Sequence, residues 1–120
     1  MKSKDLDLAR DLLVKQVLNS QTLTYREFAS SLGITEAPVI NKCTDILEKL
    51  MYEDADNQRP MLSAMVIQQG SLGIPRLGFY QILNNLKLYQ GEEFGAEAIH
   101  WHQMEINKLK KYYNLEHNEK

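Results

Sequence analysis

The chain has 120 residues and a mass of 13.9 kDa, which is the size of one ordinary domain with one hydrophobic core. Its 43% hydrophobic and 25% charged residues exclude a disordered chain, a collagen-like repeat and a disulfide scaffold. Fourteen Lys and Arg against sixteen Asp and Glu give a net charge of -2. Nucleic acid or anionic lipid can therefore be bound only by a local patch of positive charge.

The sequence predicts a cytoplasmic protein that does not enter the membrane. Cys43 is the single cysteine, so no internal disulfide can form. No apolar run is long enough to span a bilayer. Near the start of the chain, Asp5, Asp7 and Asp11 interrupt the region where a secretory signal needs continuous apolar residues.

Two helices are predicted in the first quarter of the chain. Apolar residues at helical spacing predict the first helix over residues 6–18. Thr24 and Glu27 have the spacing of a capping box, in which each side chain binds a free backbone N–H group of the other residue. This pair predicts the start of a short second helix over residues 25–32.

A third helix is expected over residues 36 to about 53. Gly33 can adopt the left-handed conformation that ends the second helix, and Thr35 is placed to cap the third. Pro38 would lie in the first turn, where its missing N–H group costs nothing. The predicted buried face consists of Val39, Cys43, Ile46, Leu47 and Leu50.

The second half of the chain is expected to contain one strand and two helices. The polar residues 52–60 predict a loop, and the apolar residues 61–67 predict a strand. Several glycines and a proline indicate a turn-rich excursion over residues 68–78. Apolar spacing predicts a helix over residues 79–88, and a long final helix over residues 92–113.

A helix-turn-helix is the most specific local pattern. This motif needs a small residue between its helices, a Gly at the turn, an apolar residue beneath the turn and a branched residue in the second helix. Ala29, Gly33, Ile34 and Val39 fill these places in order. Over residues 5–82 the arrangement resembles the winged-helix family. This resemblance implies that the second motif helix enters the major groove of DNA and that the wing contacts the backbone.

The charge of the third helix opposes this function. Residues 35–56 contain two lysines and six acidic residues, a local charge of -4 that repels phosphate. A winged-helix scaffold that serves protein contacts, or only folding, therefore stays open as an alternative. The candidate nucleic-acid contacts are Tyr25, Arg26, Lys42, Lys49, Arg59 and Arg76.

Two further resemblances concern the middle of the chain. Residues 59–66, 73–75 and 78–80 look like a segment of small bacterial and phage proteins of unknown function, whose final helix carries an aromatic residue, here Trp101. The layout is also distantly similar to the DNA-binding domain of alkylguanine-DNA alkyltransferases. The reactive Pro-Cys-His-Arg segment of that family would fall near residues 65–68, which contain no Cys, so alkyl transfer is not implied.

The reactive side chains predict no catalytic or metal site. Cys43 lies on the apolar side of its helix, which favours a buried hydrophobe over a nucleophile. Glu97 and His100 form half of a di-iron carboxylate motif, and the other half is absent. His102 falls in the apolar stripe and is expected to be a hydrogen-bonded core or interface histidine. We therefore expect no enzymatic activity, no metal and no cofactor.

We thus predict one mainly α (α+β) domain with a winged-helix-like core. Residues 5–54 form its helix-turn-helix part, 60–82 a strand and a wing-like glycine-rich loop, and 92–113 a C-terminal helix. The leading prediction is an intracellular DNA-associated or regulatory protein. The alternative is a protein-interaction module, such as an inhibitor or immunity partner, that uses the acidic edge at residues 48–56. Three-four spacing in the last helix also predicts a homodimer through it.

Overall fold

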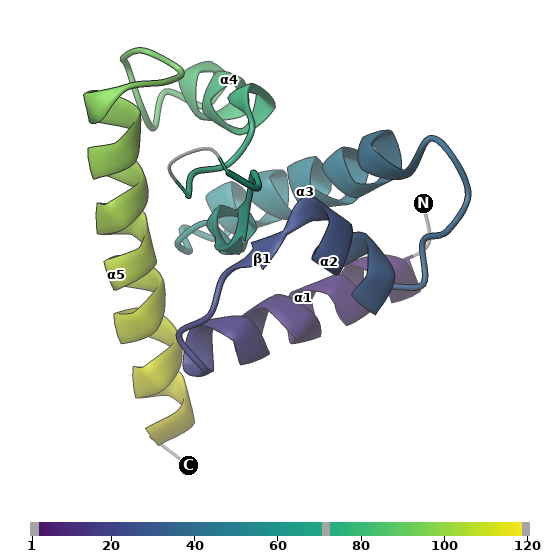
Figure 1. Ribbon diagram of the computed structural model, residues 1–120. Helices are drawn as coiled ribbons and strands as arrows, with labels where there is room; N and C mark the ends of the chain where they lie inside the picture. Colours follow the sequence, from purple (N-terminus) through teal and green to yellow (C-terminus); the bar gives the residue numbers. More distant parts are fainter. Residues whose placement is uncertain (1–2, 71–72, 119–120) are drawn as a thin grey trace.

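The chain folds into a mainly helical structure with one very small sheet (Figure 1). The computed structural model describes residues 3–70 and 73–118. In chain order, the elements are α1 (Ser3–Leu18), β1 (Leu23–Thr24), α2 (Tyr25–Ser31), α3 (Val39–Asp56), the 3-10 helix η1 (Leu62–Met65), β2 (Val66–Ile67), α4 (Leu77–Asn85) and α5 (Ala96–Asn118). The mainly helical class with a small β element is confirmed.

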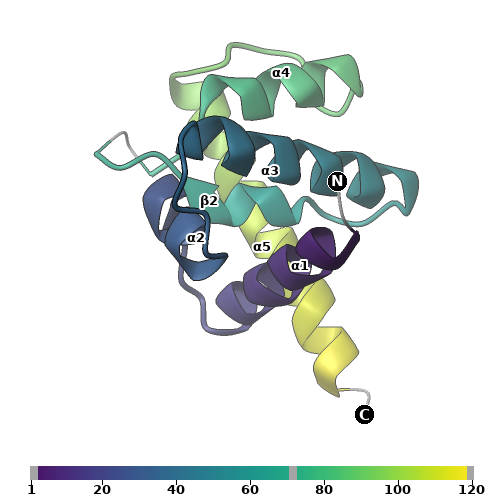
Figure 2. The same ribbon diagram turned by 90° about the vertical axis from the view of Figure 1, so that its right-hand side faces the viewer.

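The helices pack around η1, which lies in the core. Helix α3 lies between α1 and α4, and α5 runs across the end of α1 and contacts η1 (Figures 1 and 2). All four residues of η1 are buried. They meet apolar side chains that the surrounding helices bury at helical spacing, namely Ala9, Leu13 and Val17 from α1, Cys43 and Leu50 from α3, and Leu109 from α5.

The predicted capping box and turn are present. The Thr24 Oγ1 atom accepts a hydrogen bond from the Glu27 nitrogen at 3.1 Å, and the Thr24 nitrogen donates to Glu27 Oε1 at 2.9 Å. Gly33 has a φ of 75°, and the Ile34 nitrogen donates to the Ala29 carbonyl at 2.9 Å, which closes the end of α2. Residues 24–50 therefore form two helices joined by a sharp turn.

Helix α3 starts later and ends later than expected. It begins at Val39, and Pro38 is its extended N-cap residue rather than part of its first turn. The ring of Pro38 disfavours the helical conformation of Ala37 and thereby a helix that begins at residue 36. Thr35 consequently does not cap it. At the other end α3 continues to Asp56.

Most of the strand predicted over residues 61–67 is the 3-10 helix η1. Only Val66–Ile67 form a strand, which pairs in parallel with Leu23–Thr24. The reason lies in tertiary contacts. The backbone nitrogens of Met61 and Leu62 donate hydrogen bonds to carboxylates of α5 and α3, whereas in a longer strand these nitrogens would donate to a neighbouring strand. The two strands are far apart in sequence and are not the arms of a hairpin.

The segments on either side of α4 also differ from prediction. The expected wing-like loop includes residues 71–72, which lie outside the described residues; its described ends meet where the Gln68 nitrogen donates to the Ile74 carbonyl at 2.9 Å. Helix α4 ends before Lys87, whose φ of 62° breaks the helix. Gly95, with a φ of 89°, stops α5 from starting at residue 92.

Candidate nucleic-acid interface

Tyr25 and Arg76 join the start of α2 to the segment that precedes α4. Tyr25 is 7% exposed, and its hydroxyl oxygen accepts a hydrogen bond from the Arg76 backbone nitrogen at 3.0 Å. The guanidinium carbon of Arg76 lies 5.7 Å from the centre of the Tyr25 ring, a cation–π distance. Burial raises the pKa of Tyr25, so its hydroxyl stays protonated at neutral pH.

A cleft of about 230 Å³ adjoins this pair. It brings together three segments of the chain: the start of α2, the first turn of α3 and the residues that flank the glycine-rich loop. The lining residues are Thr24, Tyr25, Arg26, Ile40, Gln68, Gln69 and Arg76. Arg26 and Arg76 are exposed, and neither forms an ion pair with a carboxylate among the described residues. Three of the predicted contacts, Tyr25, Arg26 and Arg76, therefore line one cleft, and two of them are cationic.

Lys42 and Lys49 lie on α3 outside the lining of this cleft. The Lys42 Nζ atom donates to the Glu36 carbonyl at 3.0 Å and thereby holds the turn before α3. Lys49 is exposed and follows two helical turns later. The exposed stripe of α3 consists of Asn41, Asp45, Lys49, Tyr52 and Asp56. Its two acidic residues against one lysine leave this face of α3 unsuited to phosphate.

Arg59 belongs to a structural ion-pair network beyond the C-terminal end of α3. Its Nε atom lies 3.1 Å from Asp54 Oδ1, and Arg10 lies 2.8 Å from both Asp54 and Glu53. Asp54 is 0% exposed and also accepts a hydrogen bond from the Leu62 nitrogen. Since α3 has 18 residues and is about 27 Å long, Arg59 is remote from the cleft at its other end.

The same ion-pair network reduces the uncompensated negative charge of the acidic edge at residues 48–56. Glu53 and Asp54 are both paired with Arg10, so half of the four carboxylates of this edge already have a cation. Glu48 and Asp56 form no ion pair with another described residue. The edge therefore carries less uncompensated negative charge than its sequence indicates.

Two of the reactive residues that the sequence analysis considered, Cys43 and His102, are buried in structural roles. Cys43 is buried, its Sγ atom lies 3.8 Å from the Tyr25 carbonyl, and burial raises the pKa of its thiol, which disfavours the nucleophilic thiolate. His102 is buried and its Nε2 atom lies 2.8 Å from the Ala64 carbonyl, as expected of a core histidine. Among residues 3–70 and 73–118, no group of three or more His, Cys, Asp or Glu could hold a metal ion.

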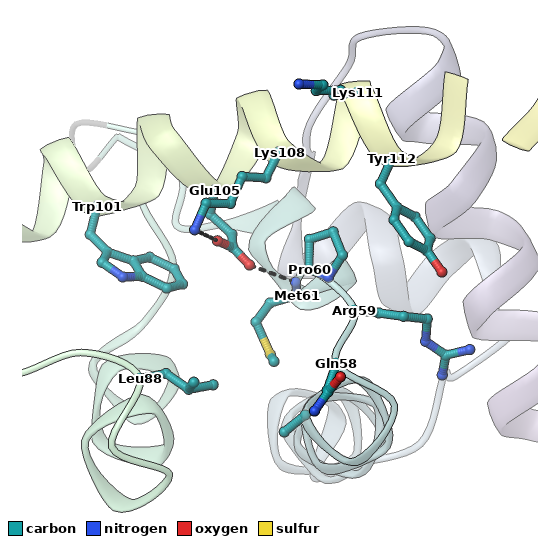
Figure 3. A pocket seen from close by; sticks show the side chains of 11 residues that line it. Gln58, Arg59, Pro60, Met61, Leu88, Trp101, Glu105, Lys108, Lys111 and Tyr112 are labelled. Carbon is teal, nitrogen blue, oxygen red and sulfur yellow. Dashed lines mark hydrogen bonds and ion pairs between the residues drawn. The ribbon is translucent and has the colours of Figure 1, made fainter. Parts of the chain in front are cut away.

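Sequence reasoning missed a second, larger hollow beside α5. It has a volume of about 600 Å³ and lies between α5 and the corner at residues 58–61 (Figure 3). Trp101 and Tyr112 extend from α5 on either side of Glu105, whose carboxylate accepts a hydrogen bond from the Met61 nitrogen at 2.7 Å. The aromatic residues of the last helix were a partial sequence signal for this hollow. No sequence pattern indicates that this helix packs beside residues 58–61.

Comparison with protein families, curated proteins and solved structures found no match to this chain. Within the part of the chain that the structure describes, every helix is too short or too polar to cross a membrane.

Proposed function

We propose that the protein binds nucleic acid, with double-stranded DNA as the first candidate, through the cleft that contains Arg26 and Arg76. One observation carries the proposal: these two arginines, 50 positions apart in sequence, line the same open cleft at the helix-turn-helix. The Tyr25 hydroxyl fixes the backbone of one of them. Guanidinium groups are the usual partners of phosphate oxygens because they donate two parallel hydrogen bonds.

The other lining residues suit the same ligand. Gln68, Gln69 and Thr24 supply amide and hydroxyl groups, which contact phosphates, sugars or base edges in protein–DNA complexes. The order of helix, strand, helix-turn-helix, strand and glycine-rich loop supports a variant of the winged-helix arrangement. Because the exposed stripe of α3 is acidic, we propose contact through the cleft at the start of α3 rather than along its length.

The alternative prediction, a protein-interaction module that uses the acidic edge, has weaker support. Arg10 and Arg59 together balance the charges of Glu53 and Asp54 within the chain, so two of the four carboxylates of this edge are not available to attract a basic partner. The cationic cleft has no such internal compensation from the carboxylates of the described residues.

Fluorescence anisotropy with labelled duplex and single-stranded oligonucleotides at low salt tests the proposal. The double variant Arg26→Ala/Arg76→Ala is expected to bind at least about tenfold more weakly, and its salt dependence is expected to be shallower by about 1.8 in the slope of log K against log salt. The control Lys15→Ala/Lys87→Asn removes the same charge from exposed sites outside the cleft. The proposal is wrong if the wild-type chain binds neither oligonucleotide, or if both double variants lose the same affinity.

A further inference from the structure

Two hollows beside α5 form one continuous groove. The hollow of about 600 Å³ and a second one of about 540 Å³ share Trp101, Glu105 and Lys108. Along α5 the groove extends from Ala96 to Tyr112, which corresponds to about 24 Å of helix. This length suits a second helix better than a compact ligand.

The groove presents apolar surface with no partner among the described residues. Met104 is 48% exposed and Leu88 is 47% exposed, although both are large apolar side chains. Trp101 and Tyr112 are half-buried, and they extend from α5 toward Pro60 and the chain around it (Figure 3). Apolar side chains gathered beside a groove are typical of an interaction surface.

Two charged residues on the exposed side of α5, Glu97 and Lys111, are complementary to one another about Met104. Met104 lies at the centre, Glu97 lies seven residues before it and Lys111 lies seven residues after it. Seven residues are two helical turns, so the three side chains share one face. An antiparallel copy of the helix, related by a two-fold axis at Met104, would place Glu97 opposite Lys111 twice. A parallel copy would instead place each of these charges beside its own equivalent.

We propose that a second copy of this chain covers the groove, with the two α5 helices antiparallel about a two-fold axis at Met104. The apolar contacts supply most of the affinity, and the two Glu97–Lys111 pairs fix the direction of the helices, because exposed ion pairs stabilise little but discriminate between orientations. This interface differs from the one the sequence predicted. The three-four stripe consists of Ile99, His102, Ile106, Leu109 and Tyr113. The last four are buried in the chain's own core, and Ile99 is partly buried against it.

Sedimentation velocity over a range of concentrations tests the proposal. The wild-type chain is expected to dimerise as its concentration rises. Glu97→Lys and Lys111→Glu are each expected to raise the dimer dissociation constant about tenfold or more, because each places like charges opposite one another at two points. When the two variants are mixed, a heterodimer is expected, since every facing pair is then Lys against Glu.

Matched controls come from exposed residues of α1. Asp11→Lys and Lys15→Glu change charge in the same way away from the groove and are expected to leave dimerisation unchanged. Met104→Lys, which places two cations at the axis, is expected to abolish the dimer. A wild-type chain that stays monomeric at the highest concentration, or charge variants that dimerise as well as the wild-type chain, would overturn the proposal.

Discussion

The backbone nitrogen of Arg76 donates a hydrogen bond to the hydroxyl of Tyr25, a residue 51 positions earlier in the chain. The bond joins the first turn of α2 to the segment that enters α4. Arg76 and Arg26 line the same cleft. The position of one proposed contact therefore depends on a tyrosine that is itself almost wholly buried.

Tyr25→Phe is expected to destabilise the fold by about 1 kcal/mol, because the Arg76 N–H group loses its acceptor while the packing of the ring is kept. Urea unfolding measures this loss, and hydrogen exchange at Arg76 should become faster. Tyr52→Phe, at an exposed site on α3, serves as the control and should have no effect. Equal stability of the Tyr25 and Tyr52 variants would contradict the importance of this bond.

Asp54→Ala is expected to destabilise the fold by about 3–5 kcal/mol, because it removes the buried carboxylate that pairs with Arg10 and Arg59 and leaves the buried Leu62 N–H group without an acceptor. Asp54→Asn should cost less, since the amide oxygen can still accept one of these bonds. Thermal and urea denaturation measure both losses. Asp56→Ala removes an exposed carboxylate two residues away and should change stability little.

His102 should make the fold less stable as the pH falls. Burial lowers the pKa of His102 below 6.5, its value when unfolded, so between these two pKa values the unfolded chain binds more protons than the folded chain. The stability that the neutral imidazole contributes is full above pH 6.5 and is lost as the pH falls toward the folded pKa. Urea unfolding at a series of pH values measures this slope, and NMR titration of the ring measures the pKa directly.

His102→Gln provides the matched comparison for this pH dependence. Its side-chain amide can donate to the Ala64 carbonyl, which is the acceptor of the histidine Nε2, but it does not titrate. The variant should lose the decrease of stability below pH 6.5. If the slope in that range is as steep in the variant as in the wild-type chain, another group is responsible.

Glu105→Gln is expected to stabilise the fold at neutral pH. Burial raises the pKa of Glu105 above 4.5, so the charged form is disfavoured in the folded chain and its cost grows as the pH rises through the folded pKa. A glutamine oxygen can accept the Met61 hydrogen bond without that cost. Glu105→Ala should instead destabilise by about 1–3 kcal/mol, because the buried Met61 N–H group loses its partner. Urea unfolding of the two variants at pH 7 must give opposite signs.

Features that depend on short stretches of sequence could be predicted. The capping box of Thr24 and Glu27 involves residues only three positions apart, and Gly33 ends α2 through its own backbone conformation. Both features could therefore be recognised from the local sequence. Cys43 and His102 are buried as their helical spacing indicates. These local rules predict helix α2, the turn that follows it and much of the core.

Features that depend on distant partners could not be predicted. An apolar run such as Met61–Ile67 suits a strand, and only the carboxylates of Asp54 and Glu105 make its first half a 3-10 helix. Arg59 is a residue type that often contacts nucleic acid. Its ion pair with Asp54 instead holds it at the other end of α3, away from the candidate site. The meeting of Arg26 with Arg76 likewise depends on the path of the chain through the whole domain.

Two consecutive backbone nitrogens, those of Met61 and Leu62, donate to carboxylates that lie on either side of them in the sequence, Glu105 on α5 and Asp54 on α3. The 3-10 helix at the centre can therefore reach its native state only after both helices have docked. A fragment that stops before α5 would keep the sequences of α2 and α3. Its Met61 N–H group would have lost its acceptor, Glu105. Folding of this chain should consequently be all-or-none, because the core around η1 is complete only when α5 has docked.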